Sequence, residues 1–124
     1  MKVLIVEQEK TFRESLSNIM EHYRGFEVFT AYSLKEGASL FQSVPFDMVI
    51  CGHRLPDGDG LEQLKEWMTC HPKMVSIFMT AHHDEALRKD AEKAGIRGYL
   101  EKPFDLRQLE EAIGISDCGW RNVE

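Results

Sequence analysis

The chain has 124 residues, of which 43% are hydrophobic and 29% are charged, a composition that suits one globular domain with a single core. Its net charge of −6 argues against a surface that binds nucleic acid, because contacts with phosphates need clustered lysine and arginine side chains. No apolar run approaches the roughly 20 residues that a membrane span requires, and the N-terminal run Lys2–Val6 reaches an acidic residue too soon for a secretory signal.

Five short apolar runs predict β-strands, and the amphipathic stretches between them predict helices. The expected strands are Lys2–Val6, Phe26–Ala31, Asp47–Cys51, Val75–Met79 and Gly98–Leu100. The first, third and fourth are nearly continuous in apolar residues, which is typical of parallel strands that are covered on both faces.

The first helix is expected to begin at Thr11, because Thr11 and Glu14 have the spacing of a capping box. Gly25 follows its last turn, where a glycine commonly ends a helix. The apolar stripe of this helix consists of Phe12, Leu16, Ile19, Met20 and Tyr23.

The later helices carry similar signals. Ser33 and Glu36 form a second capping box, Asp84 is placed to cap the fourth helix, and the fifth helix is expected over Leu106–Ile113. The inward-facing residues predicted for the second, third and fourth helices are Ala38, Leu40, Phe41, Leu61, Leu64, Trp67, Met68, Leu87, Ala91 and Ala94.

The regular alternation of strands and helices predicts an α/β fold, with a doubly wound parallel sheet, right-handed crossovers and helices on both faces. We expect one domain over residues 1–113. Residues 114–124 are expected to form a C-terminal tail or the start of a linker, with Trp120 as a large apolar group in a polar segment. This short ending favours a longer native protein.

In open parallel sheets, functional groups gather at the carboxyl ends of the strands. The candidate residues at these ends are Glu7, Gln8, Gly52, Thr80 and Lys102. They belong to four ordered motifs, Glu7-Gln8, Gly52 followed by Leu55-Pro56 and Asp59-Gly60, Met79-Thr80-Ala81, and Glu101-Lys102-Pro103-Phe104. Taken together, these motifs resemble the receiver domain of two-component response regulators over Lys2–Ile113.

This resemblance implies a flavodoxin-like (βα)5 fold with strand order 2-1-3-4-5. In the family, two acids after the first strand and an aspartate after the third hold Mg²⁺, and that aspartate accepts a phosphoryl group. Thr80 matches the switch hydroxyl, Lys102 the ammonium group that pairs with the phosphoryl group, and Tyr99 the aromatic residue that moves with the threonine. The roles of the threonine and the aromatic residue place Thr80 and Tyr99 on the expected switch and signalling face.

The sequence departs from the family pattern at three positions. Gly52 stands at the acceptor position and has no side chain to phosphorylate, Gln8 replaces the second acid, and Glu7 is longer than aspartate. One formal negative charge therefore remains where the family has three, and each such charge at ~4 Å is worth ~4 kcal/mol at an effective dielectric near 20. We expect Mg²⁺ binding to be lost or very weak, and we predict no cofactor.

Two cations are expected near this depleted acid cluster. Lys102 has lost its aspartate partner, and Arg54 follows Gly52 by two residues. Our hypothesis is that Glu7 pairs with one or both of them, so that a cation of the protein replaces the metal ion. A degenerate phosphorylation pocket of this kind would be locked.

Two other sites are conceivable from the sequence. Asp57 and Asp59 are the nearest alternative phosphoacceptors, but both match positions of the turn before the third helix. A transition-metal site could be formed by Cys51, His53, His82 and His83. We favour the interpretation that the histidines lie in loops on a polar rim and that Cys51 lies in the core. The adjacent residues His82 and His83 cannot easily bind the same ion.

The favoured function is an atypical receiver that signals through protein–protein interaction without aspartyl phosphorylation at the usual site. A conventional phosphorelay receiver with a non-standard acceptor such as Asp57 is one alternative. A small flavodoxin-like cofactor-binding protein is another, although the segment after the first strand is acidic and lacks glycine. We find no catalytic constellation and predict no enzyme.

The expected partner is a protein or an attached output domain. It would bind the face formed by the fourth helix, the strand Gly98–Leu100 and the helix Leu106–Ile113, where a homodimer is also conceivable. No direct contact with nucleic acid or with a membrane is expected. The scattered cysteines, odd in number, favour reduced thiols and a cytoplasmic location.

Overall fold

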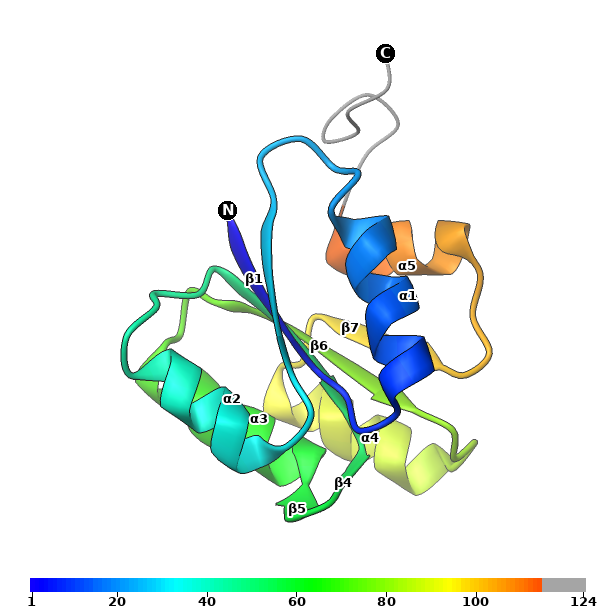
Figure 1. Cartoon of the computed structure of the whole chain (residues 1–124). Coiled ribbons are helices and arrows are strands. Elements are labelled where there is room, and N and C mark those ends of the chain that lie inside the picture. Colours follow the sequence, from blue (N-terminus) through cyan, green and yellow to red (C-terminus); the bar gives the residue numbers. More distant parts are fainter. Residues whose placement is uncertain (115–124) are drawn as a thin grey trace.

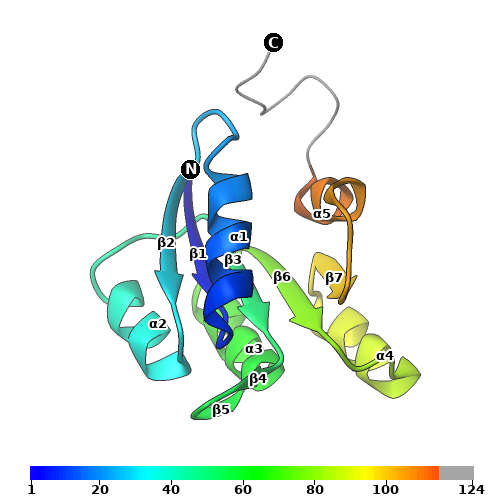
Figure 2. The same cartoon turned by 45° about the vertical axis from the view of Figure 1, so that its right-hand side comes forward.

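The computed structural model describes residues 1–114. These residues form a five-stranded parallel sheet with helices on both faces, as Figure 1 and Figure 2 show. The strands, in their order across the sheet, are β2 (Glu27–Ala31), β1 (Lys2–Val6), β3 (Met48–Gly52), β6 (Val75–Thr80) and β7 (Gly98–Glu101). The helices are α1 (Lys10–Met20), α2 (Leu34–Phe41), α3 (Gly60–Cys70), α4 (Glu85–Ala94) and α5 (Leu106–Ile113).

The predicted α/β fold and its flavodoxin-like strand order are confirmed. The order β2-β1-β3-β6-β7 equals 2-1-3-4-5 once β4 (Arg54–Leu55) and β5 (Gly58–Asp59) are set apart, because these two-residue strands pair only with each other. The sequence predicted a turn there and missed this small hairpin. The expected tail from residue 115 onward, with Cys118 and Trp120, lies outside the described residues.

Two apolar layers hold the helices against the sheet. In β1, Val3 and Ile5 pack toward α1 and α5, whereas Leu4 and Val6 pack toward α2 and α3. All four side chains are buried, because alternate residues of a strand point to opposite faces and both faces are covered. Within residues 1–114, no helix has the length and apolar character needed to cross a membrane.

The predicted start of α1 is wrong. The helix begins at Lys10, its N-cap is Glu9 without a side-chain capping bond, and Thr11 lies inside the first turn. The backbone N–H of Glu9 donates to the Glu7 carboxylate in the loop after β1, and the N-cap lies two residues before Thr11, where the capping box predicted it. Ile19, predicted to face inward, is 40% exposed.

The predicted end of the first helix at Gly25 is also wrong, because α1 ends at Met20 with Glu21 as its C-cap, whereas the capping signals of α2 and α4 are confirmed. The Ser33 hydroxyl accepts from the backbone N–H of Glu36, and the Asp84 carboxylate accepts from that of Ala86. Gly95, with a φ of 87°, ends α4 in the left-handed conformation. The four residues predicted to face inward from α3 include three that are buried, Leu61, Leu64 and Trp67.

A close backbone contact sets α3 against the end of β3. A Cβ atom at Gly60 would lie 1.7 Å from the carbonyl oxygen of Gly52, and the backbone N–H of Gly60 donates to the carbonyl of His53 at 2.7 Å. The Asp59 carboxylate caps the helix by accepting from the N–H of Leu61 at 2.8 Å. Only glycine allows this approach, so Gly60 helps to hold the backbone of Gly52 in place.

We predict that Gly60→Ala lowers the free energy of unfolding by about 3 kcal/mol, because its methyl group meets backbone atoms that cannot move independently. Gly25→Ala is the matched control, since a Cβ there has no neighbour within 4 Å and meets only the strain of a φ of 84°, about 1–2 kcal/mol. Urea denaturation measures both. A Gly60→Ala protein no less stable than Gly25→Ala would contradict the close contact.

Candidate functional site

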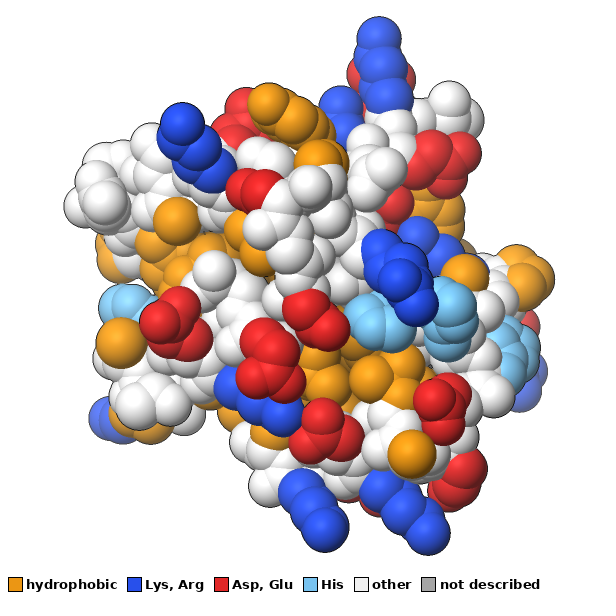
Figure 3. Space-filling model, turned by 90° about the horizontal axis from the view of Figure 1, so that it is seen from below, with side chains coloured by type: hydrophobic (Ala, Val, Ile, Leu, Met, Phe, Trp, Pro, Cys, Tyr) orange, Lys and Arg blue, Asp and Glu red, His pale blue; other side chains and the backbone are white. Residues whose placement is uncertain are grey.

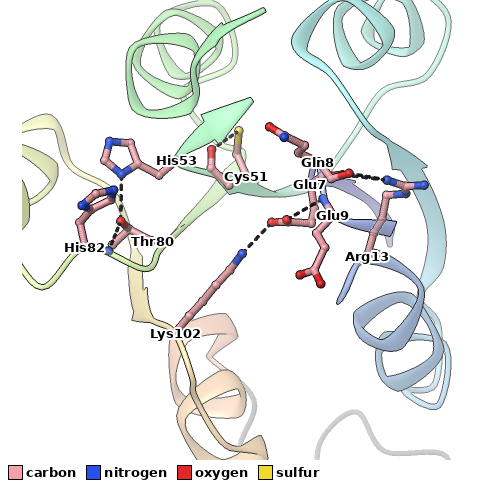
Figure 4. A network of polar contacts seen from close by, with 10 residues as sticks. Glu7, Gln8, Glu9, Arg13, Cys51, His53, Thr80, His82 and Lys102 are labelled. Atoms are coloured by element: carbon pink, nitrogen blue, oxygen red, sulfur yellow. Dashed lines mark hydrogen bonds and ion pairs between the residues drawn. The ribbon is translucent and has the colours of Figure 1, made fainter. Parts of the chain in front are cut away.

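The strand-end site lies at the carboxyl edge of the sheet, which Figure 3 shows from below. On this face histidine side chains lie beside a basic side chain toward the right, other basic side chains are spread over the view, and carboxylates lie toward the middle. Figure 4 shows the polar contacts of the site, which join residues of β3 and β6 with the segments that follow β1 and β7. We define the strand-end site as Glu7, Gly52, Thr80 and Lys102.

An ion pair joins the two ends of this site. Lys102 Nζ donates to Glu7 Oε1 at 3.0 Å (Figure 4). The second oxygen, Glu7 Oε2, accepts from the backbone N–H of Glu9, also at 3.0 Å. The Glu7 side chain is only 7% exposed and that of Lys102 is 24% exposed. Glu7 therefore has a partner on each oxygen, as a buried carboxylate requires.

The Lys102 ammonium group is also held from a second side. Its Nζ lies 4.2 Å from the centroid of the Phe12 ring, a position in which the face of an aromatic ring attracts a cation. Phe12 in turn packs edge-on against Phe104. The lysine therefore sits between a carboxylate and an aromatic face.

Gly52 provides the room that this ion pair occupies. Its backbone is buried at the end of β3, and a Cβ atom added there would lie 2.9 Å from Glu7 Oε1. The carboxylate of Glu7 thus takes the space beside residue 52 into which a side chain would project. The exposed amide of Gln8 lies apart from the ion pair (Figure 4).

The hydroxyl of Thr80 is engaged on the other side of the site. Thr80 Oγ1 accepts from the backbone N–H of His82 at 2.9 Å and shares a hydrogen bond with His53 Nδ1 at 2.9 Å (Figure 4). Thr80 is 1% exposed, so these partners satisfy a hydroxyl that water does not reach.

The hypothesis that Glu7 takes a protein cation as its partner is confirmed for Lys102. The alternative pairing of Glu7 with Arg54 is wrong, because Arg54 points elsewhere and its Nε donates to His82 Nε2 at 2.8 Å. Arg54 is exposed at the rim, as predicted. A ring nitrogen can accept this bond only through a free lone pair.

Tyr99 lies on β7, where its ring contacts Phe78 at a centroid distance of 5.8 Å. The guanidinium of Arg88 stacks over the Tyr99 ring at 4.5 Å and lies 3.6 Å from the Glu101 carboxylate. Burial raises the pKa of the Tyr99 phenol, and the Glu101 charge adds to the shift. The ring is thus sandwiched between the core and a charged pair.

Both alternative acceptors have structural roles. The two oxygens of Asp57 accept from the backbone N–H groups of Leu34 and Lys35, each at 2.9 Å. These hydrogen bonds lower the pKa of the Asp57 carboxyl. Asp59 caps α3. The sequence predicted the turn around Asp57 but missed its contact with α2, 22 residues away in the chain.

In residues 1–114, no group of three or more histidine, cysteine, aspartate and glutamate side chains is arranged to hold a metal ion. Cys51 lies fully in the core, and burial raises the pKa of its thiol, with the charges of Glu7 and Asp59 adding to the shift. The histidines lie at the rim as expected, but His53 and His82 also bond Thr80 and Arg54. In the sequence, this role of His53 and His82 was indicated by the position of both residues shortly after strand ends.

A comparison with known families identifies the family of this chain. The sequence model of the response regulator receiver domain matches residues 3–114. The chain belongs to this family. The receiver domain is a signalling module of two-component systems, and the strand-end site stands where the resemblance places the family's phosphorylation pocket.

Individual relatives agree with this assignment. The chain is 33% identical over 116 residues to the transcriptional regulatory protein CrdR of Helicobacter pylori, covering 90% of this chain and 53% of CrdR. It is 33% identical over 115 residues to the response regulator protein PilR of Pseudomonas aeruginosa, covering 93% of this chain and 26% of PilR. The chain thus spans about half of the first relative and about a quarter of the second.

The receiver domain shares its structure with solved relatives. A response regulator receiver domain protein from Clostridium thermocellum has a TM-score of 0.81 and 32% identity, covering 91% of this chain and 90% of that chain. A receiver domain protein from Methanospirillum hungatei has a TM-score of 0.82 and 28% identity, covering 91% and 90% of the two chains.

We predict that Glu7→Gln lowers the free energy of unfolding by about 2 kcal/mol, between the values typical of exposed and of buried ion pairs, because it leaves the Lys102 ammonium group without a counter-charge. Glu27→Gln is the control, since Lys2 and Glu27 form an ion pair whose side chains are 38% and 61% exposed. It should lose less than about 0.5 kcal/mol. Equal losses in the two variants, measured by urea denaturation, would contradict a stabilising role of the buried pair.

Proposed function

We propose that this receiver domain is a pseudo-receiver, a non-enzymatic module that signals through protein–protein contacts without aspartyl phosphorylation at the strand-end site. The observation that carries the proposal is the replacement at residue 52. Glycine stands there, and the Glu7 carboxylate lies 2.9 Å from the place of a Cβ atom. There is neither an acceptor side chain nor free space for one while Glu7 remains in place.

The ion pair also argues against Mg²⁺ at this site. Mg²⁺ is held by oxygen ligands, usually with one or two carboxylates. Glu7 already neutralises one protein cation at 3.0 Å, and neither Gly52 nor Gln8 adds a second negative charge. A divalent ion would have to displace the Lys102 ammonium group and then remain close to it, which like-charge repulsion opposes.

A phosphorelay through Asp57 receives no support from its geometry. Phosphorylation would cost the carboxylate its hydrogen bonds to the N-terminus of α2, which help to begin that helix. Asp57 also lies in the turn between β4 and β5 rather than at the end of a sheet strand. The same reasoning applies to Asp59, which caps α3.

The proposed interaction surface is the face of α4, β7 and α5. It carries Tyr99 and the adjacent pair of Arg88 and Glu101. CrdR and PilR, which are longer than this chain, are named as regulators, and this favours an attached output domain as the partner. A second copy of the chain is the other candidate. The net charge of −6 disfavours direct contact with DNA.

We predict that the chain forms no phosphoryl adduct when it is incubated with acetyl phosphate and Mg²⁺, because neither the acceptor nor the metal charge is present. Intact-protein mass spectrometry measures the result. A conventional receiver domain treated in parallel serves as the positive control. An adduct mapped to Asp57 or to any other aspartate would support the phosphorelay alternative and overturn the proposal.

We further predict that the double variant Gly52→Asp with Gln8→Asp regains Mg²⁺ binding. The aspartate introduced at position 52 would compete with Glu7 for Lys102, and the aspartate introduced at position 8 would restore the second acid. With a Kd of about 1 mM, 10 mM Mg²⁺ would stabilise the folded state by about 1.4 kcal/mol.

The matched control for this experiment is Gly52→Asn with Gln8 unchanged, which adds a side chain of nearly the same shape without charge. Thermal unfolding with and without Mg²⁺ measures the effect. The wild type and the control should respond alike and weakly. A wild-type protein that gains as much stability from Mg²⁺ as the double variant would show that the strand-end site still holds the metal.

A further inference from the structure

Three ionisable side chains meet beside the Thr80 hydroxyl, and no step of the proposed function uses them. We define the rim cluster as His53, Arg54 and His82. The rings of His53 and His82 lie nearly perpendicular to each other, with centroids 5.3 Å apart. Arg54 Nε donates to His82 Nε2. The cluster therefore concentrates potential positive charge next to the switch threonine, away from Glu7 and Lys102.

The bond between Thr80 and His53 depends on the charge of the imidazole. A hydroxyl has one proton and two lone pairs, and Thr80 Oγ1 already accepts from the His82 N–H. With neutral His53, Nδ1 can accept the Thr80 hydroxyl proton. With protonated His53, both ring nitrogens carry protons, so Nδ1 must donate and the Thr80 proton loses its acceptor. Because Thr80 is 1% exposed, water cannot readily replace that acceptor.

The surroundings of His53 favour its neutral form. Burial lowers the pKa of the His53 imidazole below its usual value. The charges of Arg54 and His82 lower this pKa further, whereas the Asp59 carboxylate opposes them. The native state therefore binds fewer protons at His53 than the unfolded chain does. Its contribution to stability is complete above a pH of about 6.5 and is lost as the pH falls through the folded-state pKa.

The second contact of the rim cluster has the same charge dependence. His82 Nε2 accepts from Arg54 only while that nitrogen has a free lone pair. A proton on this nitrogen would remove the acceptor and place two cations in contact. Protonation of this nitrogen would therefore break the bond to Arg54, just as protonation of His53 would remove the acceptor of the Thr80 proton.

The rim cluster also touches the proposed interaction face. The His53 ring packs edge-on against Phe78 at a centroid distance of 5.3 Å, and Phe78 packs against Tyr99 at 5.8 Å. The Tyr99 hydroxyl is buried without a hydrogen-bond partner in the described structure. A buried hydroxyl without a partner costs free energy, so a movement of this ring would break no hydrogen bond of its hydroxyl.

We propose that the rim cluster is a proton-operated latch, in which protonation of His53 and His82 releases Thr80 and Arg54 and alters the face around Tyr99. This inference deepens the proposed function and rests on it, since it names a regulator for a receiver that accepts no phosphoryl group. The latch is closed at neutral pH and opens in acid, below the pH at which an unperturbed histidine takes up its proton.

The test is an NMR titration of the chain from a pH of about 7.5 to about 5.0, which spans the range in which histidine titrates, without a phosphate donor or Mg²⁺. The signals followed are the amides of Thr80 and Tyr99, the Nε of Arg54 and the histidine rings. We expect the Thr80 and Tyr99 signals to shift together with the His53 ring. In His53→Gln they should stay in place over this range.

His22→Gln is the matched control, because His22 is exposed and its ring bonds the carbonyl of Asn18, four residues earlier in the chain. In this variant the Thr80 and Tyr99 signals should shift with pH as they do in the wild type. A second variant, His82→Gln, keeps the backbone N–H that Thr80 uses, so the Thr80 response should persist while the acid response of Arg54 Nε is lost. This second variant tests the latch even if His53→Gln does not fold.

Three outcomes would overturn the latch. They are signals of Thr80 and Tyr99 that do not move with pH, signals that move equally in His53→Gln, and an Arg54 response that is unchanged in His82→Gln. None of these results bears on phosphorylation, because no donor is present. Conversely, an aspartyl adduct formed with acetyl phosphate would overturn the pseudo-receiver and leave the titration result intact, so the two failures are distinguishable.

Discussion

The ion pair between Glu7 and Lys102 is the interaction on which the strand-end site depends. It joins the residue after β1 to the segment after β7, across the end of β3. Two replacements make it possible. Gly52 leaves room for the carboxylate, and the neutral Gln8 leaves Glu7 as the acid in reach of the ammonium group. A buried carboxylate needs a partner on each oxygen, and here both partners come from the chain.

Most of the fold could be predicted because it follows from patterns that are local in the sequence. Continuous apolar runs identify strands that are covered on both faces, and caps such as Ser33 and Asp84 depend on residues within one turn of the helix. The predicted start of α1 was wrong, because the loop before it includes a contact between residues that are far apart in the sequence. Glu7 accepts the Glu9 N–H through one oxygen, and the other oxygen of the same carboxylate accepts from Lys102, 95 residues away in the chain.

The candidate site could be predicted as a set of residues but not as a set of bonds. The strand ends fix which residues share one edge of the sheet, so Thr80 and Lys102 were expected beside Gly52. Which cation pairs with Glu7 depends on where the long side chain of Arg54 goes. His82 decides this by accepting its Nε. Such choices among rotamers depend on neighbours that periodicity and motif spacing do not reveal.

The site consists of two halves that are satisfied separately. Lys102 is held by Glu7 and Phe12, and the Thr80 hydroxyl is held by His53 and the His82 N–H. In the pattern that the family resemblance implies, one phosphoryl group contacts both the lysine and the threonine and so couples them. Where no phosphoryl group forms, Lys102 keeps Glu7 as a fixed counter-charge, and we expect no change in its contacts. The Thr80 hydroxyl is bonded to His53, and protonation of that ring would reverse which partner donates, so this half is where we expect a response to pH to begin.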